Sequence, residues 1–108
     1  MHIVRRITFE TTPEGVHVLA LADHEDARGQ TLTFRRADGD AAPTVSNESG
    51  ASVVGGVTAV IDGWHLRLGL TPEAAETLGL PVEVDLFLEL ARVEGTMLRD
   101  GLAAVGLA

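Results

Sequence analysis

The sequence predicts a single α+β domain spanning residues 1–108. It indicates an antiparallel sheet of about six to seven strands, a short helix between the late strands and a C-terminal amphipathic helix packed on one face. Two observations support this prediction. Apolar and polar residues alternate through most of the chain, and apolar residues recur at helical spacing near its end. A run of strands followed by helices is typical of α+β domains and not of wound parallel sheets.

The beginning of the chain is predicted to form a β-hairpin. Residues 2–10 alternate, with an apolar face that includes Ile3 and is interrupted by Arg5. Residues 12–15 (Thr-Pro-Glu-Gly) have the composition of a tight turn. Residues 16–22 are apolar on both faces, as expected of a central strand that pairs with the first. Two further strands are predicted at residues 31–35 and 44–47.

A second hairpin is the strongest local prediction. Residues 52–61 and 64–70 flank Asp62-Gly63, a dipeptide favoured in two-residue type I′ turns because both central positions require positive φ. Gly55-Gly56 inside the first of these strands indicates a bulge or a close backbone approach. Trp64 is expected on the apolar face of the second strand.

Residues 71–79 contain the signals of a short helix. Thr71 is a suitable N-cap, Pro72 fits the first helical position, and Gly79 fits the C-terminal end. Residues 82–90 then alternate again and predict a strand with one apolar and one largely acidic face.

Apolar residues at helical spacing predict the amphipathic helix at the end of the chain, and they are Val93, Met97, Leu98, Leu102 and Val105. Gly95, Gly101 and Gly106 each weaken it by about 1 kcal/mol relative to alanine. We therefore expect packing against the sheet to stabilise this helix.

The charge and composition restrict the functions open to the chain. Acidic residues outnumber basic ones by 16 to 8, which gives a net charge of −8 and disfavours nucleic acid as a partner. The chain has no cysteine, so we expect a reducing compartment, the cytoplasm, and no thiolate metal site. Neither a signal peptide nor a membrane-spanning run is apparent, so no membrane association is expected.

No motif predicts catalysis or a cofactor. Asp23-His24-Glu25-Asp26 offers oxygen and imidazole ligands, but adjacent side chains diverge, and a solvated loop is the better interpretation. Residues 50–56 are glycine-rich without the lysine of a phosphate-binding loop, and no nucleophile elbow is present. We therefore expect a binding protein without catalytic residues, metal or cofactor.

Carboxylates are the candidate contacts with a partner. Those predicted on one strand face could complement a basic protein surface, because such charges accelerate encounter and discriminate between partners. Together with the acidic loop before residue 27, the candidate set is Asp23, Glu25, Asp26, Glu83, Asp85 and Glu89.

Several segments together resemble a known family. They are Gly50-Ala51-Ser52-Val53-Val54-Gly55-Gly56-Val57, then Asp62-Gly63 with an L-x-L-x-L segment, and Leu70-Thr71-Pro72-Glu73-Ala74-Ala75. In these segments the chain resembles bacterial immunity proteins of polymorphic toxin systems, immunity family ten. The resemblance implies a protein that binds and neutralises the effector domain of a cognate toxin, such as a nuclease or a deaminase. It supplies no catalytic residues.

Two alternatives remain open at this point. One is a structural or accessory domain that self-associates through exposed apolar surface, such as Phe87 on the acidic strand face. The other is a small metal-dependent enzyme that uses the loop from Asp23 to Asp26. The mass of the isolated chain in solution separates the first from a monomeric inhibitor, and bound metal would support the second.

Overall fold

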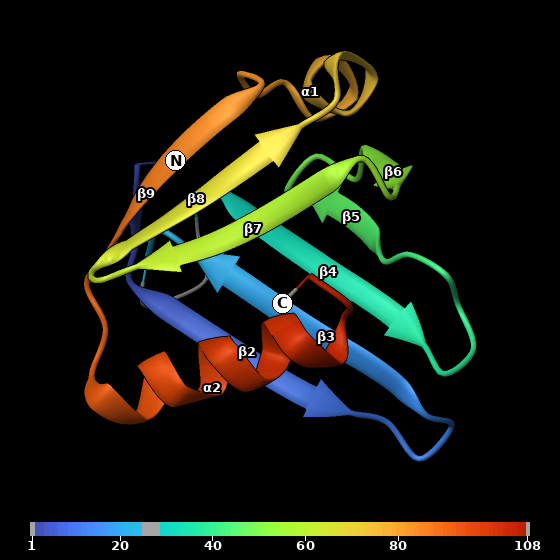
Figure 1. Ribbon diagram of the computed structural model, residues 1–108, viewed down its shortest axis with the longest axis horizontal. Coiled ribbons are helices and arrows are strands. Elements are labelled where there is room, and N and C mark those ends of the chain that lie inside the picture. The colour runs from blue at the N-terminus through green and yellow to red at the C-terminus, as the bar shows by residue number, and fades with distance from the viewer. Residues whose placement is uncertain (1, 25–28, 108) are drawn as a thin grey trace.

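A computed structural model describes residues 2–24 and 29–107 (Figure 1). Within these residues the chain forms nine strands in two sheets and two helices. The four-stranded sheet has the order β1 (Ile3–Val4), β9 (Glu83–Leu88), β8 (His65–Leu70) and β7 (Val57–Asp62). The five-stranded sheet has the order β2 (Arg6–Thr11), β3 (Val16–Ala22), β4 (Thr31–Ala37), β5 (Thr44–Asn47) and β6 (Ser52–Val54). The α+β class is confirmed, but the expected single sheet is wrong.

The two sheets arise because two predicted strands are each divided by a bend. The strand expected at residues 2–10 changes sheets at Arg5, and the strand expected at residues 52–61 changes sheets at Gly55-Gly56, where φ is 71° and 74°. Because the first bend shifts the alternation by one residue, Val4 and not Ile3 is buried. The strands of the two sheets cross steeply, as bends of this kind permit (Figure 1).

The hydrophobic core lies between the two sheets and is mainly aliphatic. Its fully buried members include Leu19 and Phe34 from the five-stranded sheet and Leu66 and Leu86 from the four-stranded sheet. The predicted hairpin of β2 and β3 is confirmed, and β3 is an interior strand, paired with β2 and β4, and not an edge strand, as its two apolar faces indicated. Among the described residues the core contains no buried charged or polar side chain.

The second hairpin differs by one residue from the expected turn. Asp62 pairs with His65, so the two-residue loop is Gly63-Trp64, and Gly63 adopts a φ of 59°. Trp64 therefore leaves the apolar face of β8 and is 64% exposed. The sequence identified the hairpin but not this displacement of its one tryptophan.

The short helix α1 (Pro72–Leu78) forms as predicted. Thr71 Oγ1 accepts a hydrogen bond from the Ala74 N–H at 3.2 Å, and Gly79 ends the helix at a φ of 67°. The helix packs against β6 and β8 and buries Ala74 and Leu78, with Ala74 beside Gly56 at the bend between β6 and β7. Its position beside this bend closes one end of the core.

Replacing Thr71 by alanine should lower the free energy of unfolding by about 1 kcal/mol, because the Ala74 N–H loses its partner. Thr71→Ser keeps the hydroxyl and serves as the control. Urea denaturation measures both variants. If the serine and alanine variants lost the same stability, the effect would come from the methyl group and not from the cap.

The C-terminal helix α2 (Arg92–Ala104) lies across β2 and β3 (Figure 1). Leu98 and Leu102 are buried as predicted, whereas Val93 is 72% exposed, because its position faces away from the sheet. Gly101 has a packing reason, since a Cβ atom there would lie 2.7 Å from Leu19 Cδ1. Neither described helix is long and apolar enough to span a membrane.

Candidate binding surface

The outer face of the four-stranded sheet carries part of the predicted acidic set. Alternation along β9 buries Val84, Leu86 and Leu88, which leaves the side chains of Glu83, Asp85 and Phe87 on the opposite face. All three are exposed, and Phe87 retains 43% of its accessible surface. This sheet face therefore combines charge with an exposed aromatic ring.

The neighbouring strand β8 partly neutralises this face. Asp85 Oδ1 lies 2.9 Å from His65 Nδ1, and Asp85 pairs in register with Arg67. The His65 ring meets Phe87 edge to face, with ring centroids 5.8 Å apart. Arg67 also lies 3.4 Å from a carboxylate oxygen of Asp62. The face therefore carries both positive and negative charges. Glu83 lies opposite Gly69 and has no ion-pair partner among the described residues.

Asp23 and Glu89 belong to a second place, the bend at Arg5. Glu89 lies 3.7 Å from Arg5 Nε, and the Arg5 N–H donates to the carbonyl of Ala22, the residue before Asp23. Asp23 Oδ1 accepts the Gln30 N–H at 3.0 Å and so helps to close the loop between β3 and β4. Glu25 and Asp26, also predicted as contacts, lie outside the described residues.

The predicted carboxylates therefore do not form one compact cluster. Glu83 and Asp85 lie on the outer sheet face, while Asp23 and Glu89 lie near Arg5. The rise of an extended strand separates Glu83 from Glu89 by roughly 20 Å. A partner that contacts both places needs a broad surface and not a single basic side chain.

The described residues supply no set of metal ligands for the alternative function as a metal-dependent enzyme. They contain no group of three or more histidine, aspartate or glutamate side chains arranged to hold an ion. Asp23 is engaged with the Gln30 backbone. Glu25 and Asp26, the other acidic residues of that loop, are outside the described part of the chain.

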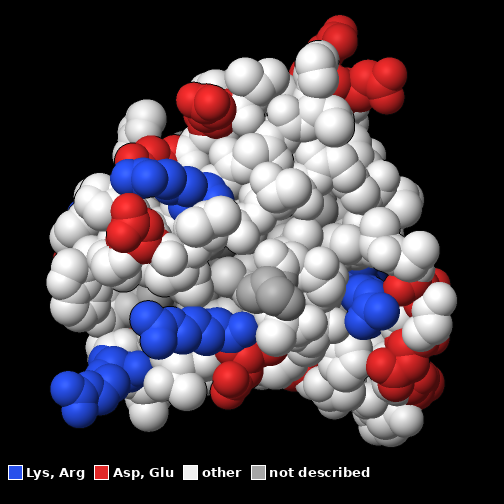
Figure 2. Space-filling model, viewed as in Figure 1, with Lys and Arg blue, Asp and Glu red and all other residues white. Residues whose placement is uncertain are grey.

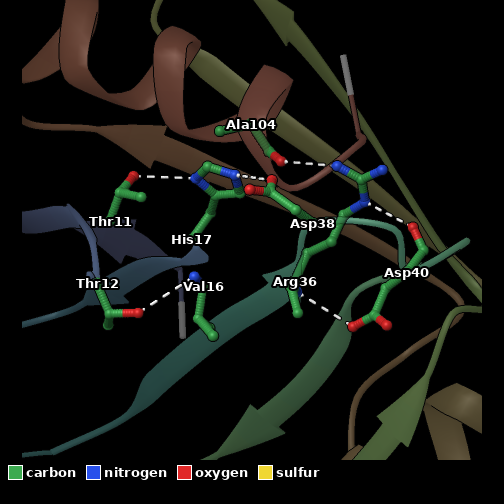
Figure 3. Close-up of polar contacts among 9 residues, drawn as sticks. Thr11, Thr12, Val16, His17, Arg36, Asp38, Asp40 and Ala104 are labelled. Carbon is green, nitrogen blue, oxygen red and sulfur yellow. Dashed lines mark hydrogen bonds and ion pairs between the residues drawn. The ribbon is translucent and has the colours of Figure 1, made fainter. Parts of the chain in front are cut away.

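A polar network that sequence reasoning missed lies at the far end of the five-stranded sheet (Figure 3). His17 Nδ1 lies 2.9 Å from Thr11 Oγ1, and His17 Nε2 lies 2.8 Å from Asp38 Oδ1. Gly15 allows this approach, because a Cβ atom there would lie 2.8 Å from the Asp38 carboxylate. The hairpin pairing of Thr11 with His17 was predictable, but the position of Asp38 depends on β4.

This network resembles a hydroxyl, imidazole and carboxylate relay in composition, but its setting is structural. The Asp38 side chain is 73% exposed, so solvent screens its interaction with the imidazole. The Asp38 N–H donates to the Gly15 carbonyl, which connects the β2–β3 turn to the end of β4. Beside it, Arg36 donates to the carbonyl of Ala104 and holds the last turn of α2 (Figure 3). These contacts connect strands β2, β3 and β4 with helix α2.

An α+β domain with an exposed sheet face of charged and aromatic groups has the features of a protein-binding module. Over residues 3–95 the chain matches a family model described as Immunity protein 10. Because this match covers most of the sequence, the chain belongs to that family, and the resemblance found in the sequence is confirmed. Searches of curated proteins and of solved structures found no match.

Proposed function

We propose that this chain is a non-catalytic immunity protein that binds and neutralises the effector domain of a cognate toxin in the cytoplasm. Membership of the immunity family is the main support for this function. The candidate surface for toxin binding is the outer face of the four-stranded sheet, where the side chains of Glu83, Asp85 and Phe87 are exposed. A net charge of −8 favours a basic partner, such as a nuclease or a deaminase domain.

Inhibition follows from occupancy of the effector surface. Carboxylates on the outer sheet face attract a basic effector domain over several ångströms before contact, which raises the association rate. The apolar surface of Phe87 is then buried when the partner binds, which releases water from it. The positive and negative charges around Phe87 determine the orientation in which the partner binds. Asp23, Glu25, Asp26 and Glu89 are proposed as additional contacts at the bend and the adjoining loop.

Co-expression with the effector domain encoded beside this chain tests the proposal. We expect one complex in size-exclusion chromatography and rescue of growth in cells that produce the effector. Absence of both complex and rescue would reject this pairing. The chain should migrate as a monomer when alone, whereas a stable dimer that buries Phe87 would favour the self-associating accessory domain.

Charge reversal on the sheet face gives a quantitative test. The double variant Glu83→Arg/Asp85→Arg should weaken effector binding by at least about 10-fold, mainly through a slower association rate. The double variant Glu14→Arg/Glu48→Arg, at two exposed turn residues of the other sheet, makes the same change in net charge and is the matched control. Surface plasmon resonance at two salt concentrations measures the rates. An equal loss from the control would mean that total charge, and not this face, determines binding.

A further inference from the structure

A hollow of about 360 Å³ lies between the tip of the β7–β8 hairpin and the first half of α2. Its walls are largely apolar and include Ile61, Trp64, Leu88, Leu90, Gly95 and Leu98. A shallower depression continues from Trp64 to Phe87. The hollow, which we call the Trp64 hollow, is therefore continuous with the outer sheet face proposed above.

Trp64 is held in an exposed position by the backbone around it. The loop Gly63-Trp64 turns the indole away from the buried face of β8 and leaves it 64% exposed. The Trp64 carbonyl accepts the Leu88 N–H at 2.7 Å, which fixes the loop against β9. A large aromatic side chain on a fixed backbone loses little conformational entropy when it is covered, and tryptophan is enriched among residues that dominate binding energies.

Two arginines without ion-pair partners in the described part of the chain line the same hollow. Arg92 and Arg99 are seven positions apart on α2, so they lie on one helix face about 10 Å apart along the axis. Arg5 and Arg67, in contrast, are paired with carboxylates. Figure 2 shows blue side chains over the region of α2 and the β7–β8 hairpin, with red carboxylates beside some of them. The described residues that line the hollow itself include the two arginines and no carboxylate. The hollow is thus a positive site on an acidic protein.

Gly95 keeps the hollow open between the two arginines. A Cβ atom added there would meet no atom within 4 Å, so local packing does not require glycine. Glycine in a helix interior costs about 1 kcal/mol relative to alanine. An unfilled space beside an exposed tryptophan and two unpaired cations has the composition of a contact site for a protein segment.

We propose that the Trp64 hollow binds an apolar side chain of the toxin's effector domain, flanked by carboxylates that pair with Arg92 and Arg99. This inference rests on the proposed function and adds a second region to its interface. Charge complementarity selects the occupant, because unpaired guanidinium groups on the wall of an apolar hollow favour carboxylates. A basic effector with a local acidic and apolar segment would contact the two regions in only one orientation, which would give specificity.

Three variants test the hollow by isothermal titration calorimetry with the purified effector domain. Trp64→Ala should raise Kd by about 30-fold or more, as expected for a residue that dominates an interface. Arg92→Glu/Arg99→Glu should weaken binding by at least about 10-fold through charge repulsion. Gly95→Leu should weaken it to a similar extent by filling the space, without lowering Tm.

Val54→Ala and Arg35→Glu are the controls, because both side chains are exposed on the five-stranded sheet, and Arg35→Glu makes the same charge change as each single substitution of the arginine pair. They should leave Kd unchanged, and circular dichroism verifies that every variant is folded. If the wild type bound the effector and the three hollow variants bound it equally well, the Trp64 hollow would be excluded while the immunity function stood. If the wild type did not bind, the proposed function and this inference would both fail.

Discussion

Replacing Phe34 by alanine should lower the free energy of unfolding by about 3–5 kcal/mol. Phe34 is the largest fully buried side chain of the described residues, and it pairs in register with buried Leu19 and Val45. Removing its ring leaves a cavity where the two crossed sheets meet, and the surrounding aliphatic side chains fill such a space only in part. The loss is a large share of the roughly 5–15 kcal/mol that stabilises a typical domain.

Urea denaturation followed by circular dichroism measures this loss. Phe34→Leu keeps most of the buried volume and should cost less than about 1.5 kcal/mol, if the site repacks. Phe87→Ala removes the same ring from an exposed position and should change stability by less than about 1 kcal/mol. Equal losses at residues 34 and 87 would contradict a shared core between the sheets.

Gly56→Ala should destabilise the domain by about 2–4 kcal/mol, through two separate effects. The φ of 74° lies in the left-handed region, where a side chain costs about 1–2 kcal/mol. The new Cβ atom would also lie 2.8 Å from Thr71 Oγ1 and 3.2 Å from Ala74 Cβ. Because the Thr71 N–H donates to the Gly56 carbonyl, the bend and the start of α1 cannot separate without losing this hydrogen bond.

Gly50→Ala separates these two effects. Gly50 has a φ of 85°, but a Cβ atom there would meet nothing within 4 Å, so only the backbone strain remains. Thermal and urea unfolding of both variants should show a loss of about 1–2 kcal/mol at Gly50 and a clearly larger one at Gly56. Identical losses would mean that α1 moves away from the bend at no cost.

Local patterns predicted the elements whose causes are local. The two hairpins and helix α1 were identified because turn residues and caps lie within a few positions of the backbone they shape. The bends at Arg5 and at Gly55-Gly56 were not recognised as changes of sheet. At Gly55-Gly56 the chain presents apolar side chains to the same core before and after the bend, so the alternating pattern gives little sign of it. At Arg5 the alternation shifts by one residue, but this shift was interpreted as an interruption of a single strand.

The sequence predicted which side chains of the candidate surface are exposed, but not which of its carboxylates are paired with basic residues. Alternation along β9 places Glu83 and Asp85 on the solvent face, as the sequence indicated. Pairing of Asp85 with His65, and of Glu89 with Arg5, depends on strand order and register, which distant residues determine. The exposure of Trp64 depends on a one-residue displacement of a turn, which turn composition alone does not specify.

The parallel pairing of β1 with β9 has a consequence for how the protein acquires its shape during synthesis. Ile3 precedes both hairpins and α1 along the chain, yet its partner Phe87 follows them and is therefore translated later. Until Phe87 is made, β1 has no partner strand. Pairing two strands so far apart in the sequence costs conformational entropy, which slows folding. Hairpins can form early on the ribosome, whereas the four-stranded sheet is completed only once β9 has been translated, so its outer face exists only after that strand is made.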